Sequence, residues 1–156
     1  MLISFGIVAL LLTLMFRSLL IGLAGTIPIV ITAMVNFGTM GLLGIPLSSA
    51  TAIISGIALG IGVDYAIHLI ERYRSNRAEG LSSTEAAYET LAHTGRAIIY
   101  NAVAVMGGFA VLLVSVFPPN RQVGGLIALN MATSAVGTLT ILLIVVVFID
   151  GHTKIF

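Results

Sequence analysis

One carboxylate, Asp64, lies in the middle of a long apolar stretch of the sequence. A charged side chain at the centre of a membrane costs about 2.5 to 3.5 kcal/mol on insertion scales, so it needs a reason to be there. Proton transport is one such reason, because low polarity favours the neutral carboxyl and a conformational change can switch it back to the charged form. The alternative is a buried aspartate that hydrogen bonds hold in place. We interpret Asp64 as functional.

Asp64 belongs to a series of small and titratable residues that recur every fourth position. This spacing places them on one gently curling ridge of a helix, which we expect to face another helix. Gly56 and Gly60 form a GxxxG pair, which is typical of close helix packing, and Gly62 is a further candidate packing position. The ridge consists of Ala52, Gly56, Gly60, Asp64 and His68.

Two neighbours of Asp64 are candidates for a proton relay. His68 can pass a proton between Asp64 and the cytoplasm, or it can be an ordinary interfacial histidine beside Glu71 and Arg72. Tyr65 points about 100° around the helix from Asp64. It can hydrogen-bond a carboxylate on a facing helix, or simply be an amphipathic interior residue.

Other polar residues inside apolar stretches are Asn101 and, at one-turn spacing, Asn130, Ser134 and Thr138. They can line a wet path or hydrogen-bond across helices, and the second role is the commoner one. The three histidines have no metal-ligand spacing, cysteine is absent, and no nucleophile elbow is present. We therefore predict no catalytic residues, no metal site and no cofactor.

The composition places this chain in a membrane. Hydrophobic residues make up 58% of the 156 residues and charged residues only 8%, which is more apolar surface than a soluble domain of this size can bury. The net charge of +1 and the lack of a basic stripe exclude a nucleic-acid partner. The predicted fold class is an all-α, polytopic bundle of transmembrane helices.

The charged residues divide the chain into about five spans that form a single transmembrane domain over residues 1–156. A span needs about 20 apolar residues. The first predicted span is short, which suggests that its helix continues upstream in a longer protein. The predicted spans are 2–16, 19–43, 47–70, 97–117 and 123–149.

The polar segment 71–96 is predicted to be a cytoplasmic surface linker. It should contain a helix that starts at Ser82 or Ser83, with Glu85 placed to complete a capping box. Orientation follows from the positive-inside rule, with Arg121 alone on the outer side. Asp150, after the last span, is expected at the interface. The cations on the predicted cytoplasmic side are Arg17, Arg72, Arg74, Arg77, Arg96 and Lys154.

The segment GIGVDYAIH from Gly60 to His68 resembles the GxxxDY motif of the resistance-nodulation-division (RND) superfamily, particularly its MMPL, hopanoid-exporter and Patched-like branches. FRS at 16–18, GLLGIPL at 41–47 and TGRAI at 94–98 are also similar to that family and occur in the same order. The five spans align with the second to sixth spans of one RND half, the block called a sterol-sensing domain in eukaryotic relatives.

The resemblance implies an exporter of lipidic or hydrophobic substrates in the cell's inner membrane, driven by the proton-motive force. Asp64 would be its proton carrier and Tyr65 the hydrogen-bonding companion. Its partners would be protons, membrane lipid, the substrate, and a second RND half, a partner chain or further copies of this chain. The family's first span and large porter domain are not seen in these residues. Its Pro-Ala-Leu ending is replaced by FIDGH at 148–152, which leaves the register near Asp150 open.

Two other functions stay open from the sequence. One is a non-transporting, lipid-binding module similar to a sterol-sensing domain, which would be indifferent to loss of Asp64. The other is a structural fragment in which Asp64 only orders helix packing. The sequence does not identify the substrate.

Overall fold

The computed structural model describes the backbone of residues 2–153 and the side chains of 5–48, 51–52, 56 and 60–152. All the regular structure in this range is helical, which confirms the predicted all-α class. The α-helices are α1 (Leu2–Phe16), α2 (Leu19–Leu42), α3 (Ser49–Ala78), α4 (Ser83–Thr90), α5 (Arg96–Ala110), α6 (Pro118–Gly137) and α7 (Leu143–Thr153).

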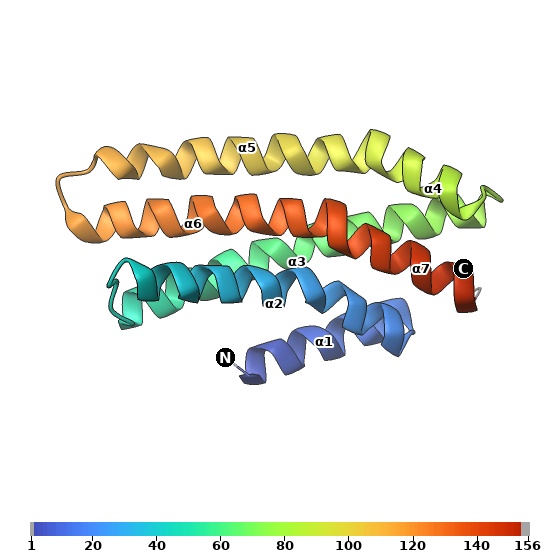
Figure 1. The fold of residues 1–156 in the computed structure, drawn as a ribbon, viewed down its shortest axis with the longest axis horizontal. Helices are drawn as coiled ribbons and strands as arrows, with labels where there is room; N and C mark the ends of the chain where they lie inside the picture. Colours follow the sequence, from blue (N-terminus) through green and yellow to red (C-terminus); the bar gives the residue numbers. More distant parts are fainter. Residues whose placement is uncertain (1, 154–156) are drawn as a thin grey trace.

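Short π-helical turns join several of these helices into longer rods, and a 3₁₀ turn at Val111–Val114 extends α5 (Figure 1). A π-turn at Leu91–Gly95 connects α4 to α5, and another at Thr138–Leu142 connects α6 to α7. Three helices among the described residues are long and apolar enough to cross a membrane, namely Leu19–Leu42, Ser83–Val114 and Pro118–His152. The predicted spans that coincide with α1 and α3 stay predictions.

The breaks between helices have local causes. Gly44 after α2 and Gly80 after α3 have φ values of 63° and 91°. Residues other than glycine rarely adopt this backbone conformation. Ser82 caps α4: its hydroxyl accepts from the Glu85 amide while the Glu85 carboxylate accepts from the Ser82 amide. The predicted capping box is therefore confirmed, with Ser82 as the cap.

The polar segment 71–96 extends two helices of the bundle. α3 continues to Ala78, well past the predicted end of its span, and α4 leads into α5 without a break in the helix. α4 packs against both α3 and α7 at that end of the bundle. The rods therefore project beyond the apolar zone.

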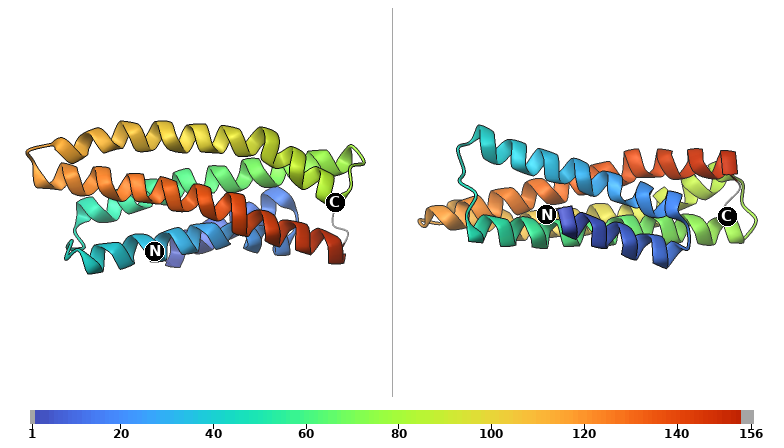
Figure 2. Two further views of the ribbon diagram at one scale, coloured as in Figure 1. Left: turned by 45° about the horizontal axis from the view of Figure 1, so that its top comes forward. Right: turned by 90° about the horizontal axis from the view of Figure 1, so that it is seen from below.

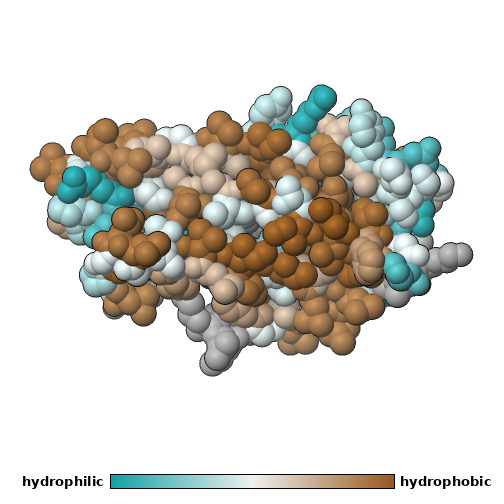
Figure 3. All heavy atoms as spheres, viewed as in Figure 1, coloured by the Kyte–Doolittle hydropathy of each residue, from teal (hydrophilic) through white to brown (hydrophobic). Residues whose placement is uncertain are grey.

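α6 lies at the centre of the arrangement and packs against α2, α3 and α5 (Figures 1 and 2). α3 and α5 both pack on α6 but make almost no direct contact with each other. The face shown in Figure 3 is mostly hydrophobic in its middle part, and its hydrophilic residues gather toward the two ends of the long axis. This distribution suits a bundle that has lipid as its solvent.

Candidate functional site

The ridge of small and titratable residues on α3 is uncovered. Its five positions, from Ala52 to His68, are all solvent-exposed in the isolated chain. A Cβ added at Gly56 or Gly60 would meet nothing within 4 Å. Among the described residues, none forms a hydrogen bond or an ion pair with Asp64. The ridge was expected to face another helix, but none of the described helices of this chain covers it.

Tyr65 points in a different direction from Asp64. Its side chain is buried, and its hydroxyl lies 3.8 Å from the sulfur of Met131 on α6. The structure therefore places Tyr65 against the inside of the bundle, while Asp64 and His68 lie on the outside. Among the described residues, the tyrosine hydroxyl reaches a thioether and no carboxylate.

Gly62 is the member of the predicted packing group that touches another helix of this chain. A Cβ at this position would lie 2.6 Å from the Ser134 hydroxyl oxygen and 3.4 Å from its Cβ. The absence of a side chain thus lets α3 approach α6 closely. This contact fixes the level of Asp64, two residues further along α3, relative to α6.

Asn130, Ser134 and Thr138 form a row of buried polar side chains along α6 and the π-turn that follows it, and their polar atoms mostly have no partner among the described residues. The Asn130 amide donates to the Leu126 carbonyl at 2.9 Å, but the Asn130 carbonyl oxygen has no partner. The hydroxyls of Ser134 and Thr138 also lack partners among the described residues. Asn101, in contrast, is exposed on α5, so the structure does not bring it together with this row.

Asn36 on α2 is a polar residue that the sequence analysis missed. It is fully buried, and neither its amide nitrogen nor its oxygen has a hydrogen-bond partner among the described residues. α2 and α6 run antiparallel (Figure 1). Gly137 lies against Pro28, and counting eight residues along each helix from this contact brings Asn36 to about the level of Asn130. Asn101 was singled out because it is a polar residue inside an apolar stretch. The same criterion applies to Asn36, which lies inside the predicted span 19–43.

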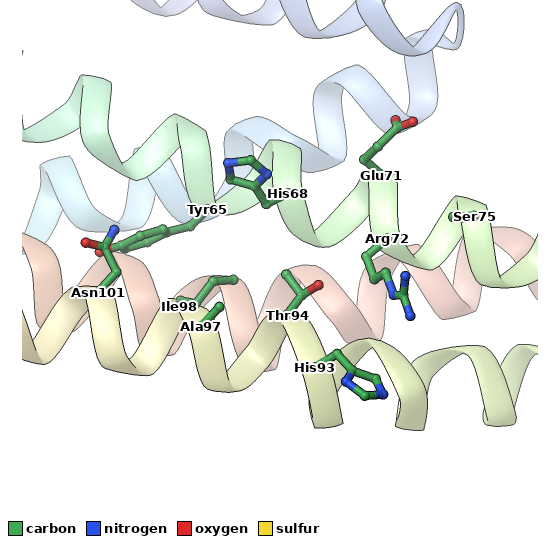
Figure 4. Close-up of a pocket in the computed structure, with 10 residues that line it drawn as sticks. All are labelled: Tyr65, His68, Glu71, Arg72, Ser75, His93, Thr94, Ala97, Ile98 and Asn101. Carbon is green, nitrogen blue, oxygen red and sulfur yellow. The ribbon is translucent and has the colours of Figure 1, made fainter.

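A cavity of about 780 Å³ opens between α3 and α5 (Figure 4). Tyr65, His68 and Asn101 lie toward one end, and Arg72 and His93 toward the other. It forms because both helices pack on α6 and leave a space between themselves. Its full lining is Tyr65, His68, Glu71, Arg72, Ser75, His93, Thr94, Ala97, Ile98 and Asn101.

Asp150 is the centre of a buried network at the predicted cytoplasmic end. One carboxylate oxygen accepts hydrogen bonds from Arg77 Nε at 2.7 Å, Ser83 Oγ at 2.8 Å and the Tyr73 hydroxyl at 2.9 Å. The Asp150 side chain is 0% exposed. The sequence predicted an interfacial residue there, but gave no sign of three donors from α3 and α4 that converge on it.

Tyr73 and Asp150 lie just beyond the predicted spans, and their environment shifts both pKa values. Burial, together with Asp150, raises the pKa of Tyr73 to about 12. Burial alone would raise the pKa of Asp150, but the hydrogen bonds from Ser83, Tyr73 and Arg77 and the charge of Arg77 hold it below 3.8. Asp150 is therefore a carboxylate, and Tyr73 a neutral phenol, at neutral pH.

The profile of the MMPL family matches residues 1–153. This chain belongs to the MMPL family. Its membership, together with the apolar helices, makes it a membrane protein and agrees with the resemblance to the RND superfamily. The GxxxDY motif at Gly60–Tyr65 therefore occurs in a chain of the family to which it pointed.

The MMPL-family chain is similar to several longer proteins. A putative membrane protein of Methanocaldococcus jannaschii is 34% identical over 137 residues, which are 88% of this chain and 35% of the relative. The trehalose monomycolate exporter MmpL3 of Mycolicibacterium smegmatis is 24% identical over 77% of this chain and 12% of the exporter. The sulfolipid-1 exporter MmpL8 of Mycobacterium tuberculosis is 28% identical over 65% of this chain and 10% of the exporter.

Proposed function

We propose that this chain is the membrane half-domain of an RND-type exporter of lipidic or hydrophobic substrates in the inner membrane, driven by the proton-motive force. The relatives named as exporters of trehalose monomycolate and sulfolipid-1 support a lipidic substrate. The chain spans about a third of the archaeal relative and about a tenth of the mycobacterial ones. The substrate path is therefore assigned to parts of the assembly outside these residues.

The uncovered ridge on α3 carries the proposal. Asp64 lies midway along α3 on a face that no described helix covers, and contact of its charge with lipid would cost about 2.5 to 3.5 kcal/mol. Gly56 and Gly60, on the same face, allow another helix to approach closely. The face therefore suits a second RND half, a partner chain or another copy of this chain, which would enclose Asp64.

In this proposal Asp64 is the proton carrier. Protonation removes the cost of an unpaired charge and lets the covered helices repack, so that proton binding biases one of two conformations. His68 lies one turn nearer the predicted cytoplasmic end and lines the cavity between α3 and α5, which supports its role as the next proton acceptor. Tyr65 sets the position of α3 against α6 through its buried ring.

Buried polar residues on α2 and α6 complete the proposed proton path. Each of Asn36, Asn130 and Ser134 has at least one buried polar atom with no partner among the described residues, and such atoms suit ordered water. Asn101 lies at the cavity end nearest Tyr65 (Figure 4). We assign these buried polar residues to the outer side of the proton path, and the cavity between α3 and α5 to its cytoplasmic side.

The test is proton flux into proteoliposomes under an imposed pH gradient, with this chain alone and with its longer protein or partner chain present. Asp64→Asn should abolish the flux. Glu79→Gln makes the same chemical change on an exposed carboxylate at the end of α3 and should leave flux unchanged. Flux that Asp64→Asn does not change, or no flux under any condition, would overturn the relay and favour the lipid-binding or structural alternative.

A further inference from the structure

The end of the cavity that holds Arg72 contains polar groups that the proposed relay does not use. Arg72 Nε is buried and has no hydrogen-bond partner among the described residues. His93 and the hydroxyls of Thr94 and Ser75 line the same end, from the opposite helix and from α3. A guanidinium group with an unpaired donor at the edge of an open cavity is a ready site for an anion.

The acidic residues near this cavity do not neutralise Arg72. Glu71 points away from α5, whereas Arg72 points toward it (Figure 4). The Glu89 carboxylate lies 3.2 Å from His93 Nε2, with 41% and 65% of the two side chains exposed, so it is held by His93 and forms no ion pair with Arg72. The charge of Arg72 is therefore left for an external partner.

The depth of the cavity suggests what that partner is. Arg72 lies two residues past Ile70, where the predicted span ends, so its guanidinium is at the level of the lipid head groups. Ala97 and Ile98 of α5 line the cavity between Thr94 and Asn101, on the side of the membrane centre (Figure 4). The cavity thus offers a cation for a phosphate and an apolar wall for the first part of an acyl chain.

We propose that this cavity binds the phosphate of an anionic phospholipid from the cytoplasmic leaflet. Arg72 donates to the phosphate oxygens in the planar geometry of a guanidinium group, and Thr94 and His93 donate from the other side. The lipid joins α3 to α5, which otherwise make almost no direct contact. The lipid site occupies the Arg72 end of the cavity that the proposed proton path also uses, but lipid binding there does not depend on transport.

Native mass spectrometry of the chain in detergent, titrated with phosphatidylglycerol, tests the proposal. Arg72→Ala should weaken binding about tenfold, which corresponds to about 1.4 kcal/mol. Arg72→Lys should restore part of the affinity, because it keeps the charge but not the planar donors. Arg74→Ala is the matched control, since it removes an exposed arginine from the same helix end, and it should leave binding nearly unchanged.

Three results would overturn the proposal. Equal losses in Arg72→Ala and Arg74→Ala would indicate diffuse surface charge and no cavity site. Equal affinity for phosphatidylcholine would remove the preference for anionic lipid. Binding of inorganic phosphate as tight as that of the lipid would identify a soluble anion site. Thermal unfolding should show that each variant is folded, and Thr94→Val, which changes no charge and leaves α3 intact, should also weaken lipid binding.

Discussion

Arg77 near the end of α3 and Asp150 in α7 form an ion pair of 2.7 Å that joins segments 73 residues apart in the sequence. The two side chains are unequally buried, with 20% of Arg77 and 0% of Asp150 exposed. Arg77 also contacts the carbonyl oxygen of Leu81 in the turn before α4. The pair therefore closes the predicted cytoplasmic end of the bundle.

Removal of either partner should destabilise the chain, but by different amounts. Arg77→Met leaves a buried carboxylate without its cation and should cost about 3 to 5 kcal/mol. Asp150→Asn leaves an arginine that can still reach water, so it should cost less, about 1 to 3 kcal/mol. Unfolding in SDS, followed by circular dichroism, measures both. Arg74→Met, on the exposed side of the same helix, is the control, and an equal loss there would contradict the prediction.

The same network predicts how stability changes with pH. The pKa of Asp150 is held below 3.8 in the folded chain, so its contribution is fully present above pH 3.8 and is lost as pH falls through the folded-state pKa. Denaturant unfolding at decreasing pH should show this loss in the wild type. The difference between the wild type and Asp150→Asn should shrink over that acidic range. A difference that stays constant with pH would contradict the assignment.

Gly62 and Gly60 should respond differently to the same substitution. A side chain at Gly62 meets Ser134, whereas one at Gly60 meets no described atom within 4 Å. Gly62→Val should therefore destabilise the chain by about 1 to 3 kcal/mol more than Gly60→Val, because only the first overpacks the contact between α3 and α6. Unfolding in monodisperse detergent compares them. Equal effects would mean that α3 and α6 are not in close contact.

The absence of cysteine from the chain allows a direct test of the ridge as an interface. A single Ala52→Cys on the ridge should cross-link to a partner in native membranes when a bifunctional thiol reagent is added. Leu14→Cys, on the exposed face of α1, should not. The mass of the product distinguishes a second copy from another protein. Cross-linking of equal yield at both positions would indicate random collision.

The buried amide of Asn36 tests whether ordered water occupies the proposed proton path. No described residue is a hydrogen-bond partner of its two polar atoms, so the proposal assigns these hydrogen bonds to water. Asn36→Leu would displace that water and should destabilise the fold by about 1 to 3 kcal/mol. Asn130→Leu should cost at least as much, because it also removes the hydrogen bond to Leu126. Unfolding in SDS measures both variants, and stabilisation by Asn36→Leu would indicate a dry amide and contradict the proposed path.

Much of this molecule follows from local sequence. Composition alone predicts an all-α membrane bundle, because so much apolar surface has to face lipid and helices satisfy their own backbone groups there. The capping box at Ser82 and the glycine break at Gly44 depend on nearby residues only. The ridge that ends in Asp64 and His68 follows from four-residue spacing, which holds for any straight helix.

The tertiary structure decided which faces are covered. Spacing places Gly60 and Gly62 on different faces of α3, but only the packing of α6 shows that Gly62 is in contact and Gly60 is open. In the same way, convergence of α3, α4 and α7 buries Asp150, and the antiparallel register of α2 and α6 brings Asn36 level with Asn130. These relationships join residues far apart in the chain. Periodicity fixes only the direction of each side chain around its own helix, and the choice of neighbour depends on the whole bundle.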